Sequence, residues 1–262
     1  MVAAPAFLAN PERFMAFSRW AAPALGALAV ALAAAGLWLG FSAPPDYQQG
    51  ETVRIMFIHV PAAVMSMFVY ACLGVASFLA LVFRHMLADC AAQAAAVLGT
   101  GFTVLALVTG SLWGRPMWGA WWVWDARLTS VLVLFFLYLG YIALVNAFDD
   151  ASRGARAGSL LALVGVVNLP IIKFSVDWWN TLHQPASIVR MGGPTIDPSL
   201  LWPLLIMIGA FMLLFSWLLL LRMRTALNQR KAQALQIYEA ETSRQGRAAG
   251  IGDPAAGLAL RR

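Results

Sequence analysis

The segment "WGRPMWGAWWVWDAR", residues 113–127, joins two long apolar stretches, Ala91–Trp113 and Leu128–Phe148. Five tryptophans and one aspartate fall within the thirteen positions from Trp113 to Asp125. Each flanking stretch is long enough for a helix to cross the hydrocarbon core of a bilayer, which takes roughly 17 to 25 apolar residues. The segment is therefore predicted to connect two membrane spans at one surface of the membrane.

The composition of the 262-residue chain supports a membrane location, because 61% of its residues are hydrophobic and only 11% are charged. Soluble domains carry about 25% charged residues. Four further apolar stretches of spanning length are present, at Trp20–Phe41, Ala62–Phe83, Gly158–Phe174 and Leu201–Leu221. We therefore expect an all-α fold, a polytopic membrane protein with a bundle of six transmembrane helices.

Two of these stretches, the fifth and the first, differ from a plain apolar span. Asn168, Pro170 and Lys173 interrupt the fifth, so a neighbouring helix or a polar cavity must satisfy the backbone groups that the proline frees. The first could be a signal peptide, since arginines precede it and the small residues of "FSAPP" follow it. Its apolar length of about 20 residues exceeds the roughly 7 to 15 of a signal-peptide core, which favours an uncleaved helix.

The basic residues predict how the chain is oriented. With the N-terminus inside, the inner side holds Arg13, Arg19, Arg84, Arg153, Arg156 and the basic residues from Arg222 onward. The outer side holds five basic and five acidic residues, namely Arg54, Arg115, Arg127, Lys173 and Arg190 with Asp46, Glu51, Asp125, Asp177 and Asp197. The positive-inside rule then places both termini on the inner side. This distribution explains the net charge of +6 without nucleic-acid binding.

The orientation divides the chain into a membrane domain, three outer loops and a tail. The outer loops are expected at 42–61, 114–127 and 175–200. Residues 1–225 are expected to form the transmembrane domain. Residues 226–262 are expected to form a cytoplasmic tail that is partly disordered, because charged residues there give way to Gly, Ala and Arg.

Two of the three histidines fall on the predicted outer side. His59 ("MFIHVPAAV") lies just before the second span and His183 ("DWWNTLHQPAS") follows the fifth, while His85 lies in an inner connection. Haem iron accepts two neutral imidazoles on opposite faces. The pair therefore predicts a haem site in which His59 and His183 bind the iron. No CxxCH motif is present, so the expected cofactor is haem b held without a covalent bond.

The outer loops supply the other parts of such a site. Tryptophan offers a large, rigid apolar face and one indole donor, and arginine can pair with the haem propionates. The expected aromatic wall consists of Trp113, Trp118, Trp121, Trp122 and Trp124, with Trp178 and Trp179 from the third loop. The expected propionate partners are Arg54, Arg115, Arg127 and Arg190.

Each of these features also has a purely structural interpretation. Tryptophans collect in belts at membrane surfaces, although a belt spreads around the perimeter and does not gather five into one loop. Asp125 directly precedes the fourth span and could cap that helix, with or without a role in the site. A single histidine at a membrane surface is usually incidental, whereas two beside a tryptophan cluster favour a binding site. Met65, Met67 and Met117 could in principle be soft iron ligands, but Met65 and Met67 lie within a span and are expected to pack there.

Three segments together resemble one known family. The tryptophan segment is similar to the "WWD" signature of haem-handling membrane proteins, and "MFIHVPAA" and "NLPIIKFSVDWWNTLHQPASIVR" resemble the histidine segments of the haem exporter protein C family. The likeness runs from about Phe14 to Arg224 and leaves out the tail. It implies a six-helix protein of the bacterial inner membrane, not an enzyme, that binds haem on its periplasmic face.

The resemblance also implies residue roles and partners. His59 and His183 would be the axial ligands, and the haem-presenting platform would consist of Trp118, Trp121, Trp122, Trp124 and Asp125. The haem would pass to a periplasmic haem chaperone, the cytochrome c maturation protein E. Further partners would be a small single-span protein D, the A and B subunits of an ABC-type complex, and membrane lipid. No Walker motif occurs in this chain, so ATP hydrolysis would come from a partner.

Two other functions are compatible with the sequence. An electron-transfer cytochrome b would usually hold its haem between helices, with histidines deep in the spans. A permease subunit of an ABC-type transporter would use the aromatic segment for docking, and its histidines would be incidental. The position of both outer histidines at the membrane boundary favours haem binding and transfer.

Overall fold

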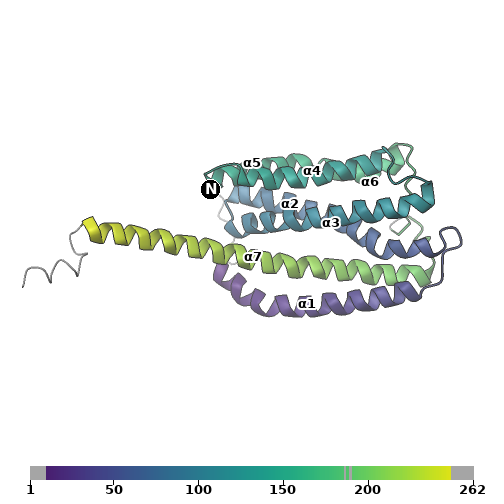
Figure 1. The fold of residues 1–262 in the computed structure, drawn as a ribbon, viewed down its shortest axis with the longest axis horizontal. Helices are drawn as coiled ribbons and strands as arrows, with labels where there is room; N and C mark the ends of the chain where they lie inside the picture. Colours follow the sequence, from purple (N-terminus) through teal and green to yellow (C-terminus); the bar gives the residue numbers. More distant parts are fainter. Residues whose placement is uncertain (1–9, 186, 189–190, 249–262) are drawn as a thin grey trace, which may run out of the picture. The chain divides into compact units, whose positions relative to one another are not determined.

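The computed structural model describes residues 10–185, 187–188 and 191–248, which form helices and the connections between them (Figure 1). The elements are α1 (Pro11–Ser42), the 3-10 helix η1 (Glu51–Ile55), α2 (Met56–Phe83), α3 (Met86–Trp118), α4 (Ala126–Asn146), α5 (Ala151–Gly165), α6 (Asn168–Trp178) and α7 (Pro198–Ala248). The chain divides into two compact units, Met1–Met223 and Arg224–Arg262. Residues 249–262, the end of the tail for which partial disorder is predicted, lie outside the described residues.

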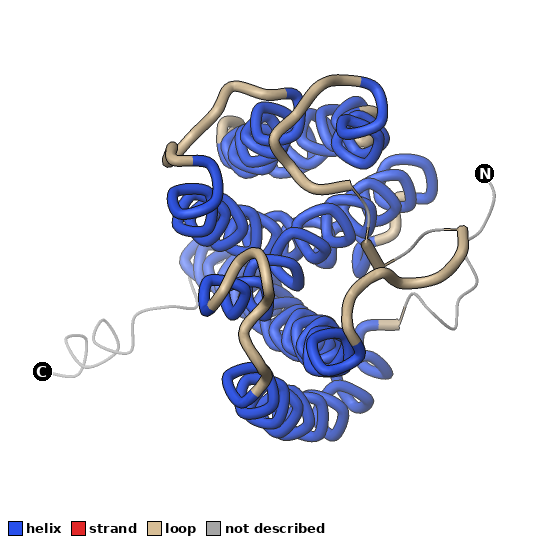
Figure 2. The backbone as a smooth tube through the Cα atoms, turned by 90° about the vertical axis from the view of Figure 1, so that its right-hand side faces the viewer, coloured by secondary structure: helices blue, strands red, loops and turns tan. Residues whose placement is uncertain are grey.

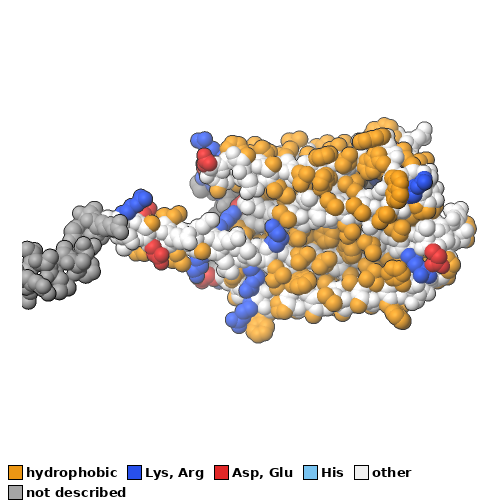
Figure 3. All heavy atoms as spheres, in the orientation of Figure 1, with side chains coloured by type: hydrophobic (Ala, Val, Ile, Leu, Met, Phe, Trp, Pro, Cys, Tyr) orange, Lys and Arg blue, Asp and Glu red, His pale blue; other side chains and the backbone are white. Residues whose placement is uncertain are grey.

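Six segments of the described residues are long and apolar enough to cross a membrane: α1, η1 with α2, α3, α4, α5 with α6, and α7. The predicted all-α bundle of six spans is thereby confirmed. Figure 3 shows apolar side chains over the visible face of the first unit, with charged side chains gathered toward its two ends. Such a surface suits a bilayer, whose hydrocarbon core accepts apolar side chains and disfavours unpaired charges.

A row of small residues along α3 determines how closely this helix approaches its neighbours. Ala92, Ala96, Gly99, Thr103 and Ala106 recur at alternating intervals of four and three positions, and all five are buried. Residues at this spacing share one face of a helix, and small side chains there let helix backbones approach each other in a membrane. α3 accordingly packs most extensively on α2, within the bundle that Figure 2 shows nearly end-on.

Tyr138 links three helices across this small-residue row. Its ring extends from α4 and lies against Gly99 of α3, leaving no room for a Cβ atom at that position. Its hydroxyl donates to the carbonyl of Ser66 on α2 at 2.8 Å, and its ring meets Tyr70 edge-on with centroids 4.9 Å apart. Because Tyr138 is fully buried, this hydrogen bond satisfies a hydroxyl that would otherwise be unpaired in apolar surroundings.

The predicted fifth span, Gly158–Phe174, is divided between α5 and α6, and it begins earlier, at Ala151. The break falls at residues 166–167. Pro170 thus occupies the first turn of α6, where its missing N–H has no helical partner to lose. Asn168 is buried beside the break, and its side-chain amide donates to the carbonyl of Ser130 on α4 at 2.9 Å.

The start of α2 differs from the prediction, because the helix begins at Met56 and not near Ala62. η1 runs directly into α2, and the side chains of Met56 and Phe57 are buried, which favours helical structure from this point. Pro61 then lies inside the helix, where it removes one backbone hydrogen bond, a loss that membrane helices tolerate. The placement of His59 in an outer loop is therefore wrong, since His59 belongs to α2.

The tryptophan segment is part helix and part loop, so the predicted loop at 114–127 is wrong at its start. α3 continues through Trp118, and the connection to α4 comprises residues 119–125. Gly119 ends the helix with a φ of 76°, a left-handed conformation that suits glycine. Its N–H bonds to the carbonyl of Arg115 and closes the last turn.

Two further boundaries differ from the predictions. The inner connection between α2 and α3 consists of Arg84 and His85 alone, because the His85 side chain accepts from the N–H of Ala88 and caps α3. α3 therefore begins before the predicted third span, and Cys90, which directly precedes that predicted span, is buried within the helix. At the outer side, α6 extends to Trp178, so the third connection begins at residue 179 and not at 175.

α1 packs on the bundle through glycines that seat large aromatic rings. A Cβ atom at Gly26 would come within 2.7 Å of the Trp217 ring on α7. At Gly40 it would come within 2.6 Å of the Phe57 ring on α2. The first span is therefore in direct contact with two other helices of the first unit.

We predict that Gly99→Ala destabilises the bundle, because the added methyl group would push Tyr138 away from Ser66. Overpacking of this kind typically costs about 1–3 kcal/mol. The thermal unfolding midpoint of the detergent-purified protein should fall accordingly. The control is Gly101→Ala, two positions further on, where nothing lies within 4 Å of the added Cβ. Equal midpoints for the two variants would contradict this packing.

Candidate functional site

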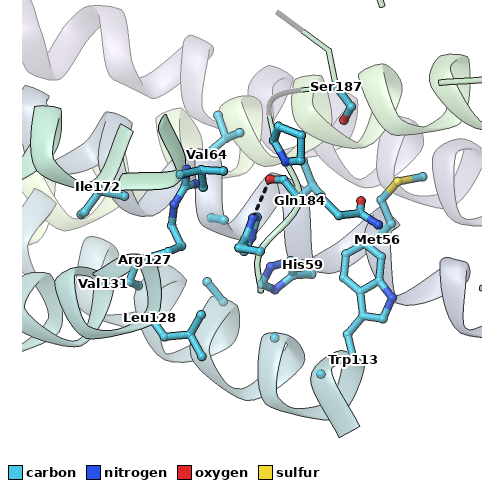
Figure 4. A pocket seen from close by; sticks show the side chains of 18 of the residues that line it. Met56, His59, Val64, Trp113, Arg127, Leu128, Val131, Ile172, Gln184 and Ser187 are labelled. Atoms are coloured by element: carbon cyan, nitrogen blue, oxygen red, sulfur yellow. Dashed lines mark hydrogen bonds between the residues drawn. The ribbon is translucent and has the colours of Figure 1, made fainter. Parts of the chain in front are cut away.

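A cavity of about 370 Å³ lies at the end of the bundle where α2 and α4 begin and α3 and α6 end (Figure 4). Small-molecule sites usually measure about 300–1,000 Å³. Much of the wall is apolar and includes Met56, Val64, Leu128 and Ile172. Six residues predicted from the sequence line this cavity: His59, Trp113, Trp118, Trp122, Arg127 and His183.

His59 projects from the start of α2 against one face of α3. Its Nδ1 atom lies 3.1 Å from the hydroxyl oxygen of Thr109. Its ring meets Trp113 edge-on, with centroids 5.6 Å apart, and Figure 4 shows the two side chains next to each other. Gly110 lies directly behind the ring, since a Cβ atom there would come within 2.8 Å of the imidazole Cε1. Three residues of α3 thus define the position of this histidine.

His183 comes from the connection between α6 and α7. Its Nδ1 lies 2.9 Å from the backbone carbonyl of Gln184, the bond drawn as a dashed line in Figure 4. Because a carbonyl only accepts, Nδ1 carries the hydrogen and Nε2 keeps its lone pair. Burial lowers the pKa of His183; the Gln184 bond raises it and the Arg127 guanidinium lowers it further. The imidazole is therefore neutral at pH 7, the form that binds metals.

Two cationic residues line the cavity, Arg127 of α4 and Lys173 of α6. The Nε of Arg127 donates to the Ser175 hydroxyl at 2.8 Å, and Nη2 donates to the carbonyl of Lys173 at 3.4 Å. Arg127, Lys173 and Asp177 all line the wall. Since a guanidinium has five N–H donors, these two bonds leave donors for an acidic group on a ligand.

The three tryptophans of the cavity differ in their surroundings. Trp113 donates its indole N–H to the side-chain oxygen of Gln49 at 3.0 Å, which ties the chain before η1 to the end of α3. Trp118 lies against Gly114, one turn back on α3. The indole nitrogen of Trp122 is buried and has no hydrogen-bond partner among the described residues. A buried donor without a partner is costly, so an acceptor on a bound ligand would stabilise this indole.

Most of the other predicted site residues lie outside the cavity wall. Four are at least half exposed, namely Trp121, Trp124, Trp178 and Trp179. Arg54 forms an ion pair with Glu51 at 2.9 Å, and Arg115 donates to the carbonyl of Gly119. Arg190 lies outside the described residues.

Asp125 caps α4, as its place before the fourth span predicts. Its Oδ1 accepts from the backbone N–H of Leu128 at 2.8 Å. Its Oδ2 is buried and has no hydrogen-bond partner within the described part of the chain. The cap anchors the tryptophan-bearing loop to a rigid helix, while a role of Asp125 in the site stays a prediction.

Sequence reasoning missed several residues that shape the cavity, among them Gln49, Thr109, Gly110, Lys173 and Gln184. Thr109 and Gly110 lie inside an apolar span, where no pattern of composition singles them out. Lys173 could have been predicted as a cavity residue, because a cation within a predicted span generally faces a partner or a polar cavity.

The described residues of the cavity do not form a metal site of the common kind that protein side chains complete by themselves. Among the described residues, no group of three or more His, Cys, Asp or Glu side chains could hold a metal ion. Structural zinc sites require four such ligands and catalytic zinc sites three. Two neutral imidazoles instead suit a metal that already carries other ligands.

Fold and cavity together define a six-span membrane protein with a tryptophan-lined site that contains two histidines at one end of its bundle. The family model described as Heme exporter protein C matches residues 5–238, and the chain belongs to this family. This match confirms the resemblance inferred from the three sequence segments.

Individual relatives support the same assignment. The chain is 60% identical to Heme exporter protein C of Bradyrhizobium diazoefficiens over 233 residues, which cover 89% of each chain. It is 51% identical to Heme exporter protein C of Escherichia coli K12 over 218 residues, covering 83% of this chain and 88% of the relative. A CcmC-like mitochondrial protein of cytochrome c biosynthesis from Marchantia polymorpha is 46% identical over 195 residues, covering 73% and 82%.

We predict that Asp125→Ala lowers the free energy of unfolding by about 1 kcal/mol, because it removes the N-cap of α4. Asp125→Asn should leave stability nearly unchanged, since asparagine caps a helix as well as aspartate does. Thermal unfolding midpoints of the three proteins in one detergent would check both expectations. A similar loss in both variants would show that the charge, and not the cap, is what stabilises the protein.

Proposed function

We propose that the protein binds haem b reversibly in this cavity and passes it to a periplasmic haem chaperone during cytochrome c biogenesis. The observation that carries the proposal is the presence of His59 and His183 in one tryptophan-lined cavity. The name of the relatives, Heme exporter protein C, supports haem as the cargo. The name of the Marchantia relative supports a place in cytochrome c biosynthesis.

The chemistry of the two histidines fits such a cargo. Haem iron has two axial positions that imidazole nitrogens fill, and the four remaining ligands belong to the porphyrin. Two side chains therefore complete a site that would be inadequate for a bare ion. Coordination by neutral imidazoles is also reversible, so a ligand on a partner could replace either one. The protein then binds and orients haem, and we assign no catalytic residue.

The polar groups of the wall fit the acidic arms of haem. Arg127 and Lys173 line the cavity, and the buried Trp122 indole still lacks an acceptor. We therefore assign the propionates to Arg127 and Lys173, with Trp122 as a neutral donor. Arg54 and Arg115 suit this role less well, because neither of them lines the cavity.

The charge distribution supports a cavity that faces the periplasm of a bacterial inner membrane. Arg84 follows α2 at the end opposite to the cavity, and Arg153 and Arg156 lie at the start of α5 on that same side. The positive-inside rule assigns such a side to the cytoplasm. Both termini are then cytoplasmic and the two histidines periplasmic.

The exposed tryptophans support a docking role beside the cavity. Trp121, Trp124, Trp178 and Trp179 remain half or more exposed, although they follow or precede residues of the cavity wall. Large aromatic side chains of this kind are enriched in protein interfaces. We infer that they face the chaperone, cytochrome c maturation protein E. The inferred membrane partners are a single-span protein D and ABC-type A and B subunits.

We predict that His59→Ala and His183→Ala each abolish or shift the low-spin visible spectrum of bound haem, because each removes one axial ligand. The measurement is the absorption spectrum of purified protein, oxidised and reduced, after expression with ample haem. The control is His85→Asn, which removes the third histidine but keeps a good capping residue for α3. This variant should keep the parent spectrum.

Other outcomes of this experiment would favour the competing functions. A parent protein that purifies without haem would overturn the proposal and favour a permease subunit. A haem that quinol reduces rapidly, and that never passes to the chaperone, would favour an electron-transfer cytochrome. Unchanged spectra in both histidine variants would remove His59 and His183 as iron ligands.

We predict that Arg127→Gln and Lys173→Gln each weaken haem binding roughly 10- to 100-fold, because a hydrogen bond to a charged group contributes about 1.5–3 kcal/mol. Titration of the haem-free protein with haem, followed by absorbance, would give the dissociation constants. Arg54→Gln is the matched control, since its guanidinium pairs with Glu51 outside the cavity. A larger loss in the control than in both cavity variants would contradict the assignment.

A further inference from the structure

The hydroxyl of Thr109 donates its hydrogen bond to one defined acceptor. Its oxygen lies 2.6 Å from the carbonyl oxygen of Leu105, one turn earlier on α3. A carbonyl oxygen only accepts, so the single hydroxyl proton of Thr109 is donated to Leu105. Toward His59, whose Nδ1 is 3.1 Å away, the Thr109 oxygen can then only accept. Nδ1 of His59 must therefore carry the hydrogen.

This direction determines which nitrogen of His59 is available to a metal. A neutral imidazole has one N–H and one lone pair, so a hydrogen on Nδ1 leaves the lone pair on Nε2. Metal-binding histidines usually donate their other N–H to a fixed acceptor, which sets both the tautomer and the ring orientation. For His59, the Thr109 hydroxyl occupies the place of that acceptor, beside the backbone carbonyl of Ala106, which also accepts from the imidazole.

Gly110 adds a steric constraint on the same ring. A Cβ atom at this position would lie 2.8 Å from Cε1 and 3.4 Å from Nδ1 of His59. Cε1 lies between the two ring nitrogens, so a group that displaces it also moves Nε2. One turn of α3 thus supplies both a hydrogen-bond acceptor for the imidazole and the space that the imidazole occupies.

We propose that Thr109 is a positioning residue for the iron ligand His59, with Gly110 providing the space for its ring. The Thr109 hydroxyl holds the imidazole as the Nδ1–H tautomer and so presents the Nε2 lone pair for coordination. The identity of the metal rests on the proposed function. The tautomer is a property of the haem-free protein and can be tested without haem.

The two histidines differ in how they are held. Nδ1 of His183 bonds to the carbonyl of the next residue, Gln184, within one connection. Nδ1 of His59 bonds across two helices, from α2 to Thr109 on α3. The orientation of His59 therefore depends on the packing of the bundle. A substitution at Thr109 should affect His59 and leave His183 unchanged.

The first test is the tautomer of His59 in haem-free protein, measured by the nitrogen-15 chemical shifts of labelled histidines. The chain has three histidines, so variants of His85 and His183 assign the signals. The expected result is an Nδ1–H tautomer for His59 in the parent and in Thr109→Ser, with a reduced population of it in Thr109→Val. An Nε2–H tautomer in the parent, or no change in Thr109→Val, would overturn the proposal.

The second test is haem binding by the same variants. Loss of a partner that orients a metal-binding histidine typically costs 10- to 100-fold in affinity, so Thr109→Val should lose roughly that factor and Thr109→Ser should recover most of it. The low-spin spectrum should also weaken in Thr109→Val. If the parent binds haem through His59 and Thr109→Val binds it equally well, the positioning role fails while the proposed function stands.

Gly110 supplies a third test, which does not depend on the Thr109 hydroxyl. Gly110→Ala should displace His59 and weaken haem ligation, whereas Gly101→Ala on the same helix meets no atom within 4 Å and should bind like the parent. Unfolding midpoints separate this effect from general instability. Equal haem spectra and affinities for the two glycine variants would contradict the proposed position of the ring.

Discussion

The close approach of α2 and α3 is the constraint on which the rest of the structure depends. Helices in a bilayer gain little from the hydrophobic effect when they associate, so packing and hydrogen bonds between them decide their positions. The small-residue row from Ala92 to Ala106 permits this approach. Its spacing of four and three continues to Gly110 and Trp113, which contact His59. The same face of one helix therefore packs on the bundle along its length and borders the candidate site at its end.

The site depends on departures from regular helix structure. Gly119 stops α3 just after Trp118, Asp125 starts α4, and the break before Asn168 separates α6 from α5. Each departure leaves backbone groups that need partners, and such groups are tolerated at membrane depth only where protein or a polar cavity surrounds them. The cavity is lined by chain segments next to these points. Helix interiors thus hold the bundle together, and helix ends carry the groups with binding chemistry.

Much of the fold could be predicted from the sequence, because a span is defined by length and apolar composition alone. The site could be predicted in outline, since His59, His183 and a dense group of tryptophans stand out in an apolar chain. The ends of helices were harder to predict. Pro61 suggests that α2 starts near this residue, whereas the buried side chains of Met56 and Phe57 favour a helix from Met56. Thr109 and Gly110 could not be found, since their importance comes from a neighbouring helix and not from their own surroundings in the sequence.

Both histidines donate Nδ1–H to the protein, so each presents the lone pair of Nε2 to the cavity. Each Nε2 is an acceptor, and two acceptors cannot satisfy each other. Apolar walls, cations and the Trp122 indole would hold the ring and acidic arms of any porphyrin, with or without a metal. The two lone pairs form coordination bonds only when the ring contains a metal such as iron. If the protein binds haem as proposed, such a site would hold the iron-containing ring more tightly than its metal-free precursor.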